Sequence, residues 1–234
     1  MKFARIETSA GVLEGEYDDG TVHTEEGTYE RDDYELLAPC EPSVFYCVGR
    51  NFGEKVEQMD YEVPDEPDFF IKPPVSLHDP ETPIPYPEFS SELTYAGELA
   101  AVIDIECKHV AEEEVDDVVR GYTILNDLDC LDQERRTARK AFDSSGPLGP
   151  VVADIDPVGL EMTTHINGEL RQEDNTENMF IKPRETISFL SERFTFKPGD
   201  VISFGSPANP GLLERGDEIE IYYEKIGTLR NTVE

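Results

Sequence analysis

Short apolar runs, each ended by glycine, proline or acidic residues, recur along most of the chain. Runs of about four to eight β-prone residues between turn signals are typical of strands. We therefore expect strands within 42–51, 94–105, 121–132, 160–168, 200–207 and 217–227. Residues 1–41 show shorter runs with turns at Gly11, 18–20 and 25–27, and these predict a small N-terminal antiparallel β subdomain.

Three segments show helical spacing instead. In 183–194, Pro183 stands at a favoured first helical position, and Ile187, Leu190 and Phe194 fall on one face. Residues 111–121 place Val115, Val118 and Val119 on one face behind a run of acids, which we interpret as a solvated face, and the basic segment 133–142 is also predicted to be helical. Few short helices among many strands indicate an α+β fold dominated by β.

A proline-rich tract covers residues 63–87 and carries eight prolines. Proline has no amide hydrogen to donate, so this tract can form neither a continuous helix nor a central strand. Its apolar insert, DFFIKPPVSL, predicts that it packs against the rest of the protein.

Charge changes the picture of the surface. The 234 residues include 52 Asp+Glu against 20 Lys+Arg, a formal net charge of −32, and the acids are spread through every segment. This favours a halophile-type surface over the alternative of one acidic interaction face. It also argues against partners with phosphate backbones or anionic lipid surfaces. Because no run approaches the roughly 20 apolar residues of a membrane span, we expect a cytoplasmic protein. The four cysteines lack disulfide or zinc spacing and are expected to be reduced and mostly buried.

Ionisable groups stand next to apolar strands at three places, where they are costly unless something uses them. These are Glu98, the trio Asp127, Asp129 and Asp132, and Lys140. Carboxylates that converge from different strands would suit a hard cation such as Mg²⁺, Mn²⁺ or Ca²⁺. By spacing alone, surface acids in an acid-rich chain are the simpler interpretation.

The order of segments resembles the catalytic domain of the fumarylacetoacetate hydrolase family. The resemblance covers residues 42–233 and rests on VFYCVGRNF, FFIKPP, ELAAVI, VVRGYTILND, KAFDSSGPLGP, INGELRQEDNT, KPGDVISFGSP and YYEKIGTLRNTV, in that order. It implies a mixed β roll over 42–234, with residues 1–41 similar to the small N-terminal region of short members. It also implies a homodimer, Mg²⁺ or Mn²⁺ bound by three carboxylates, and no organic cofactor. The substrate would be a small 2-oxo or 1,3-dicarbonyl acid that undergoes C–C hydrolysis, decarboxylation or keto–enol isomerisation through an enolate.

Individual positions carry the resemblance further. Glu98 matches the second glutamate of the family's E-x-E metal motif, and Asp127 matches its later metal aspartate. Lys140 matches a catalytic lysine, while Gly205 and Ser206 fall where the family holds substrate. The same alignment shows departures: the first metal glutamate falls on Ala96, the usual histidine on Lys55, its acidic partner on Gln58, an arginine on Leu131 and a glutamine on Glu134.

Two hypotheses follow. The first is an active enzyme with an altered site, in which Glu98 and Asp127 hold the metal and Lys140, Lys55 and Glu134 are the catalytic candidates. Enolisation would survive the loss of the histidine more easily than hydrolysis would. The second is a non-catalytic paralogue that serves as a ligand-binding or structural subunit. His78 could approach the site through folding, but a hydrogen-bonded loop histidine is the simpler interpretation.

Overall fold

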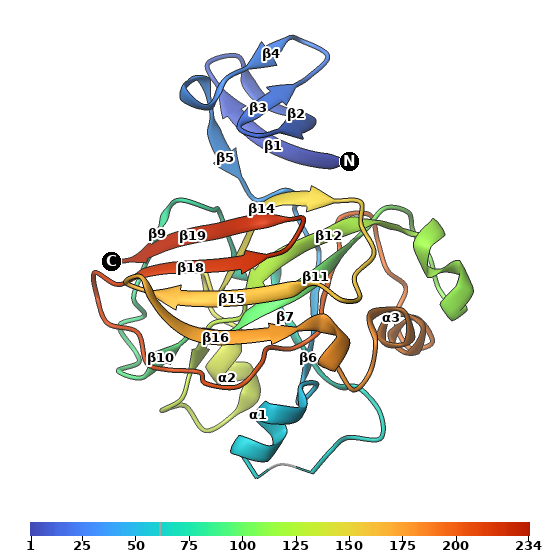
Figure 1. Ribbon diagram of the computed structural model, residues 1–234, viewed down its shortest axis with the longest axis vertical. Coiled ribbons are helices and arrows are strands. Elements are labelled where there is room, and N and C mark those ends of the chain that lie inside the picture. Colours follow the sequence, from blue (N-terminus) through green and yellow to red (C-terminus); the bar gives the residue numbers. More distant parts are fainter. Residues whose placement is uncertain (61) are drawn as a thin grey trace.

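The computed structural model describes residues 1–60 and 62–234 and consists mainly of two β-sheets (Figure 1). The larger sheet has the order β4-β3-β2-β1-β14-β12-β11-β17-β6-β7, with β5 on β1 and β8 on β14. Its strands are β1 (Lys2–Thr8), β2 (Gly11–Asp18), β3 (Thr21–His23), β4 (Thr28–Tyr29), β5 (Glu35–Leu37), β6 (Phe45–Gly49), β7 (Asp68–Lys72), β8 (Leu77–His78), β11 (Gly97–Ile103), β12 (Val119–Asn126), β14 (Gly146–Ala153) and β17 (Val201–Ser203).

A second sheet has the order β16-β15-β18-β19-β9. It is built from β9 (Pro83–Ile84), β15 (Glu161–Ile166), β16 (Glu169–Asn175), β18 (Glu218–Tyr223) and β19 (Gly227–Val233), and a separate pair joins β10 (Leu93–Thr94) to β13 (Asp129–Cys130). Most pairs are antiparallel, but β17–β6, β14–β8 and β19–β9 are parallel. The predicted strand-dominated α+β fold with mixed sheets is therefore confirmed.

The two sheets pack closely at β11. A methyl group added to Gly97 would lie 2.7 Å from Oγ1 of Thr164 and 2.8 Å from a methyl of Ile221. Only glycine leaves room for the second sheet here. The seven residues of β11 are all buried, so the next residue of that strand, Glu98, carries its carboxyl group into the interior.

Strands β1–β5 project from one end of the molecule, at the top of Figure 1. They join the larger sheet where Lys2 and Phe3 of β1 pair with Ala153 and Val152 of β14. The segment predicted as a small N-terminal β subdomain thus forms a continuation of the main sheet.

Three α-helices are described, α1 (Gly53–Gln58), α2 (Arg136–Lys140) and α3 (Pro183–Ser191), together with 3₁₀ turns at Arg31–Asp33, Pro74–Ser76, Glu112–Asp117 and Thr176–Asn178. The prediction for 183–194 holds as far as Ser191. Beyond the helix, the ring of Phe194 packs at a tilt against the ring of Tyr46. The helix expected over 111–121 is confirmed only in part. A 3₁₀ helix covers Glu112–Asp117, but Val119 already begins β12, which pairs with β11 on one side and β14 on the other.

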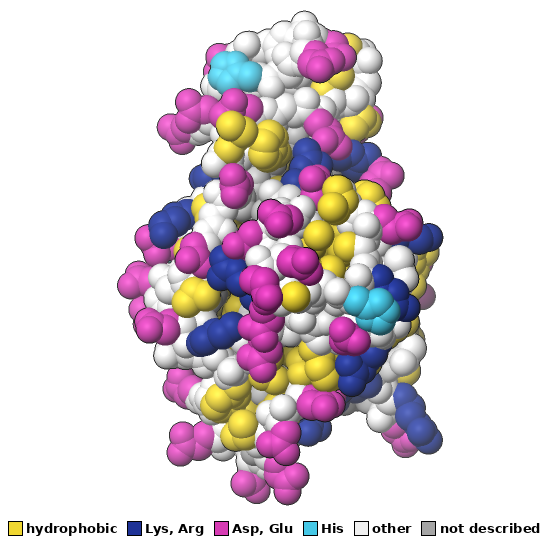
Figure 2. Space-filling model, turned by 90° about the vertical axis from the view of Figure 1, so that its right-hand side faces the viewer, with side chains coloured by type: hydrophobic (Ala, Val, Ile, Leu, Met, Phe, Trp, Pro, Cys, Tyr) yellow, Lys and Arg dark blue, Asp and Glu magenta, His cyan; other side chains and the backbone are white. Residues whose placement is uncertain are grey.

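The acidic side chains and the cysteines can both be located in the structure. Figure 2 shows acidic side chains spread over the face that it draws, with basic and apolar ones between them. The cysteines are free, and Cys40, Cys47 and Cys130 are buried. No helix in the described part of the chain is both long and apolar enough to span a bilayer.

Candidate active site

One pocket of about 240 Å³ brings together most of the residues singled out in the sequence. It lies where β6, the start of β11, the end of β12 and the helices α1 and α2 meet the loop after β17. Six predicted residues line it: Lys55, Glu98, Asp127, Glu134, Lys140 and Ser206. Ala96 and Asp129 line it as well, so the position of the missing glutamate faces the same cavity.

Glu98 is buried on β11, and one carboxyl oxygen has two donors. Oε2 accepts a hydrogen bond from Oγ of Ser203 at 2.7 Å and from the backbone amide of Gly205 at 3.3 Å. Burial, and next the charge of Asp127, raise the pKa of Glu98 to about 7, although Lys140, Ser203 and Lys55 act in the opposite direction. This carboxyl group can therefore exchange a proton near neutral pH.

The loop after β17 holds Glu98 and Ser206 in place. Gly205 has a φ of +86°, and a side chain there would press on the carbonyl of Val48 at 3.2 Å. Gly205 itself does not line the pocket but supports it through its amide. Ser206 is buried, and its hydroxyl accepts a hydrogen bond from the ammonium group of Lys55 on α1. Burial, and then the charge of Lys140, lower the pKa of Lys55.

Asp127 follows β12 and stands between two ammonium groups. Lys140 donates to Oδ2, and Nζ of Lys72 lies 2.8 Å from Oδ1. Burial opposes ionisation of Asp127, but the two lysines outweigh it and hold its pKa below the ordinary range. Burial likewise disfavours the charged form of Lys140, but Asp127, Asp129 and Glu98 raise its pKa. These carboxylates therefore favour the charged form of Lys140.

Sequence reasoning missed Lys72 and the arginines of α2. Lys72 is fully buried and donates to the carbonyls of Leu128 at 3.2 Å and Ser145 at 3.0 Å. Arg139 forms two hydrogen bonds to Asp129, of 2.8 and 2.6 Å. The available signals were a lone lysine in an apolar run and the spacing of Arg136, Arg139 and Lys140, which places all three on one helical face.

Other predicted positions lie elsewhere. Asp132 does not join Asp127, because its carboxylate accepts hydrogen bonds from Ser90 and Ser91 in a surface loop. Gln58 exchanges two hydrogen bonds with Asn209 and so ties α1 to the loop after β17. Leu131 is exposed. His78 is hydrogen-bonded to Thr82, as the simpler interpretation held, and among the described residues no histidine lines the pocket.

Residues 44–234 match the family model for the fumarylacetoacetate (FAA) hydrolase C-terminal domain. The chain belongs to the fumarylacetoacetate hydrolase family. It is 40% identical over 202 residues to an uncharacterized protein of Archaeoglobus fulgidus, covering 84% of this chain and 81% of the relative. It is 33% identical over 225 residues to the oxaloacetate tautomerase YisK of Bacillus subtilis, covering 88% of this chain and 75% of the relative.

Solved structures of the family agree over the whole chain. The 2-hydroxyhepta-2,4-diene-1,7-dioate isomerase of Mycobacterium marinum superimposes with a TM-score of 0.91 at 33% identity, covering 100% of this chain and 98% of that one. The 5-carboxymethyl-2-hydroxymuconate delta-isomerase of Mycobacterium smegmatis gives 0.91 at 32% identity, with 100% and 99% coverage. Membership of this family supports an enzyme that isomerises or hydrolyses small acids.

The donors in the pocket do not fit the divalent metal that the family resemblance implies. Among the described residues, no three histidine, cysteine, aspartate or glutamate side chains are placed to hold a metal ion. Glu98 and Asp127, the two ligands expected from the sequence, both face the pocket, but Ala96 supplies no third carboxylate and Asp127 is paired with Lys72 and Lys140.

Proposed function

We propose that this protein interconverts the keto and enol forms of a small 2-oxo acid such as oxaloacetate. The observation that carries the proposal is the convergence of the Glu98 carboxyl group with the amino groups of Lys55 and Lys140 on one pocket of about 240 Å³. A cavity smaller than the roughly 300–1,000 Å³ of drug-sized sites suits a small acid. Keto–enol exchange needs one group that moves a proton and a cation that stabilises the enolate oxygen.

Each group has a defined task in this reaction. The Glu98 carboxylate removes a proton from the carbon beside the keto group, and the electrons of that C–H bond form the enolate. The ammonium group of Lys140 stabilises the charge on the enolate oxygen. Glu98 then returns the proton to that oxygen, which yields the enol and restores the carboxylate. Lys55, held by Ser206, binds the carboxylate of the substrate.

Hydrolysis has less support than isomerisation. Cleavage of a C–C bond needs a base for water in addition to the cation, and in the described part of the chain no histidine faces the pocket. Glu134 lines the pocket but is exposed. Its role in the proposed reaction is that of a further carboxylate that contacts bound substrate. The 33% identity to an oxaloacetate tautomerase supports isomerisation of a 2-oxo diacid.

The test follows the enol absorbance of oxaloacetate in molar salt, which suits a chain of net charge −32. We expect Glu98→Gln to lower kcat by about 100-fold or more, because it removes the proton carrier but keeps a hydrogen-bond acceptor. The matched control is Glu161→Gln, the same chemical change at an exposed position of β15. A wild-type rate equal to the buffer rate would reject the proposal and favour the non-catalytic paralogue.

A further inference from the structure

Two of the four carboxylates that line the pocket, Asp127 and Asp129, are paired with basic side chains of the protein. Both oxygens of Asp127 face ammonium groups, those of Lys72 and Lys140. Asp129 is held by Arg139 through two short hydrogen bonds, and Nζ of Lys140 lies 3.5 Å from the same carboxylate. A divalent cation such as Mg²⁺ or Ca²⁺ requires several oxygen ligands, with carboxylates that are free to coordinate it.

Lys72 cannot withdraw to release Asp127. It is fully buried on β7 and is fixed by the backbone carbonyls of Leu128, Lys140 and Ser145. A metal ion at Asp127 would therefore meet a fixed positive charge on the far side of that carboxylate. Repulsion between like charges is strong in a buried environment, where little solvent screens it.

Glu98 alone cannot replace the missing ligands. One of its oxygens accepts from Ser203 and Gly205, which leaves one oxygen turned toward the pocket. Ala96, 6% exposed at the pocket wall, places a methyl group where the family has its first metal glutamate. Apart from the exposed Glu134, the described residues that line the pocket thus offer one uncommitted carboxylate oxygen, where a hard cation needs several.

The pocket is nevertheless rich in positive charge for a protein whose net charge is −32. Its lining holds five basic side chains and four acidic ones; Arg50 and Arg136 pair with Asp68, and Arg139 pairs with Asp129. The basic residues are Arg50, Lys55, Arg136, Arg139 and Lys140. Lys140 is paired with Asp127, and its charge also acts on Glu98, so this ammonium group influences both carboxylates that would otherwise bind the metal. This arrangement attracts an anion without the help of a metal.

We propose that the pocket binds a small dicarboxylate or 2-oxo acid anion without a divalent metal, with the ammonium group of Lys140 supplying the positive charge that the family resemblance assigns to Mg²⁺ or Mn²⁺. Lys55, which lines the same pocket, supplies a second cation. This inference rests on the proposed function for its choice of ligand, but it concerns binding, which can be measured without turnover.

The experiment uses oxalate, a compact dianion that mimics the enolate of a 2-oxo acid. Wild-type protein is treated with EDTA and titrated with oxalate by calorimetry in molar NaCl, first without metal and then with Mn²⁺. We expect one oxalate per chain with the same affinity in both titrations. Lys140→Met should weaken oxalate at least tenfold, Lys140→Arg should retain most of the affinity, and Lys225→Met, an exposed lysine far from the pocket, should change nothing.

A second titration measures Mn²⁺ alone. The acidic surface will bind Mn²⁺ weakly, so the informative result is the difference in Mn²⁺ binding between wild type and Glu98→Gln. We expect the two proteins to bind Mn²⁺ with the same stoichiometry and affinity. The inference is overturned if wild type binds one Mn²⁺ that Glu98→Gln loses, or if oxalate binds only when Mn²⁺ is present.

These outcomes separate the two proposals. Metal-free oxalate binding without tautomerisation of oxaloacetate would leave the inference standing and remove the proposed function. Tautomerisation that stops after EDTA and returns with Mn²⁺ would keep the function and overturn the inference.

Discussion

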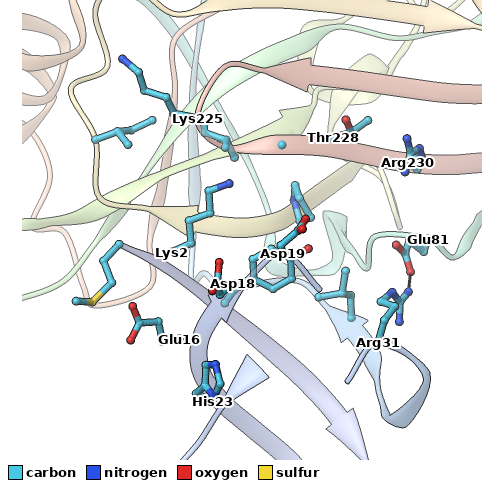
Figure 3. A pocket seen from close by; sticks show the side chains of 17 residues that line it. Lys2, Glu16, Asp18, Asp19, His23, Arg31, Glu81, Lys225, Thr228 and Arg230 are labelled. Carbon is cyan, nitrogen blue, oxygen red and sulfur yellow. Dashed lines mark hydrogen bonds and ion pairs between the residues drawn. The ribbon is translucent and has the colours of Figure 1, made fainter. Parts of the chain in front are cut away.

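Two cavities of this protein differ in the burial of their charged side chains, and the smaller cavity holds the more deeply buried charges. A cleft of about 860 Å³ separates β1–β5 from the hairpin of β18 and β19, whereas the pocket at Glu98 measures about 240 Å³. Figure 3 shows the larger cleft, whose charged side chains spread around its walls and include the ion pair of Arg31 with Glu81. Asp18, Asp19 and Lys225 in this cleft are exposed to solvent.

The difference lies in solvation. Water screens charges on the walls of the cleft, so each of them contributes little to stability and requires no partner. The charges of the pocket are buried and must be matched, because a buried ion without a partner costs several kcal/mol. Matched burial, not volume, therefore marks the region that we propose moves protons and binds an anion.

The largest expected effect concerns Asp127. Asp127→Ala removes the shared counterion of Lys72 and Lys140, and leaving buried charges uncompensated should lower the free energy of unfolding by about 3–5 kcal/mol. Urea denaturation in molar salt measures it. The matched change in the cleft, Asp18→Ala, should cost less than about 0.5 kcal/mol. Equal losses of unfolding free energy for Asp127→Ala and Asp18→Ala would contradict the difference in burial between the pocket and the cleft.

The arginines give a smaller contrast. Arg139→Met leaves the carboxylate of Asp129, which is 8% exposed, with only the more distant Lys140, and we expect a loss of about 1–3 kcal/mol. Arg230→Met breaks an exposed pair with Glu220 beside the cleft and should cost under about 1 kcal/mol. Thermal unfolding of both variants in one buffer tests the order, which would be disproved if Arg230→Met were the more damaging change.

A pH-dependent contribution to stability is expected from Asp68, which pairs with two arginines of the pocket. Arg136, through two hydrogen bonds of 2.8 Å, lowers the pKa of Asp68, and Arg50 adds to this. A carboxyl group whose pKa is lower in the folded state stabilises the fold above its unfolded pKa, and this contribution is lost as the pH falls. Asp68 is partly exposed, so Asp68→Asn should cost less than about 1 kcal/mol at pH 7. Unfolding curves from pH 7 down to about pH 3 should show the difference between variant and wild type disappearing; a difference that persists at the acidic end would refute the assignment.

The smallest expected effect is on the cleft itself. Asp18→Asn combined with Lys225→Met removes two exposed charges from its lining. We expect an unchanged rate of oxaloacetate tautomerisation, because neither residue approaches Glu98. A substantially lower rate would assign the cleft a part in the reaction and end the distinction drawn between the two cavities.

Local patterns were sufficient for much of the fold. The alternation and spacing of apolar residues located the strands at Phe45–Gly49, Gly97–Ile103 and Glu218–Tyr223, because burying a strand requires apolar side chains whatever it pairs with. The pattern held only in part at 111–121, where valines suited a helix equally well. There the pairing of β12 with two neighbouring strands decided the structure, and such pairing depends on segments far away in the chain.

The sequence by itself determined which side chains are out of place. They are an acid, Glu98, in an apolar strand, a lysine, Lys140, near the end of a basic segment, and an alanine, Ala96, where the family resemblance implies a metal ligand. Only the tertiary structure decided what these residues do to one another. It placed Lys72 beside Asp127, 55 positions away along the chain, and paired Asp129 with Arg139. Whether a buried carboxylate is free to bind a metal depends on such partners, because Coulomb energy falls with distance in space and takes no account of distance in sequence.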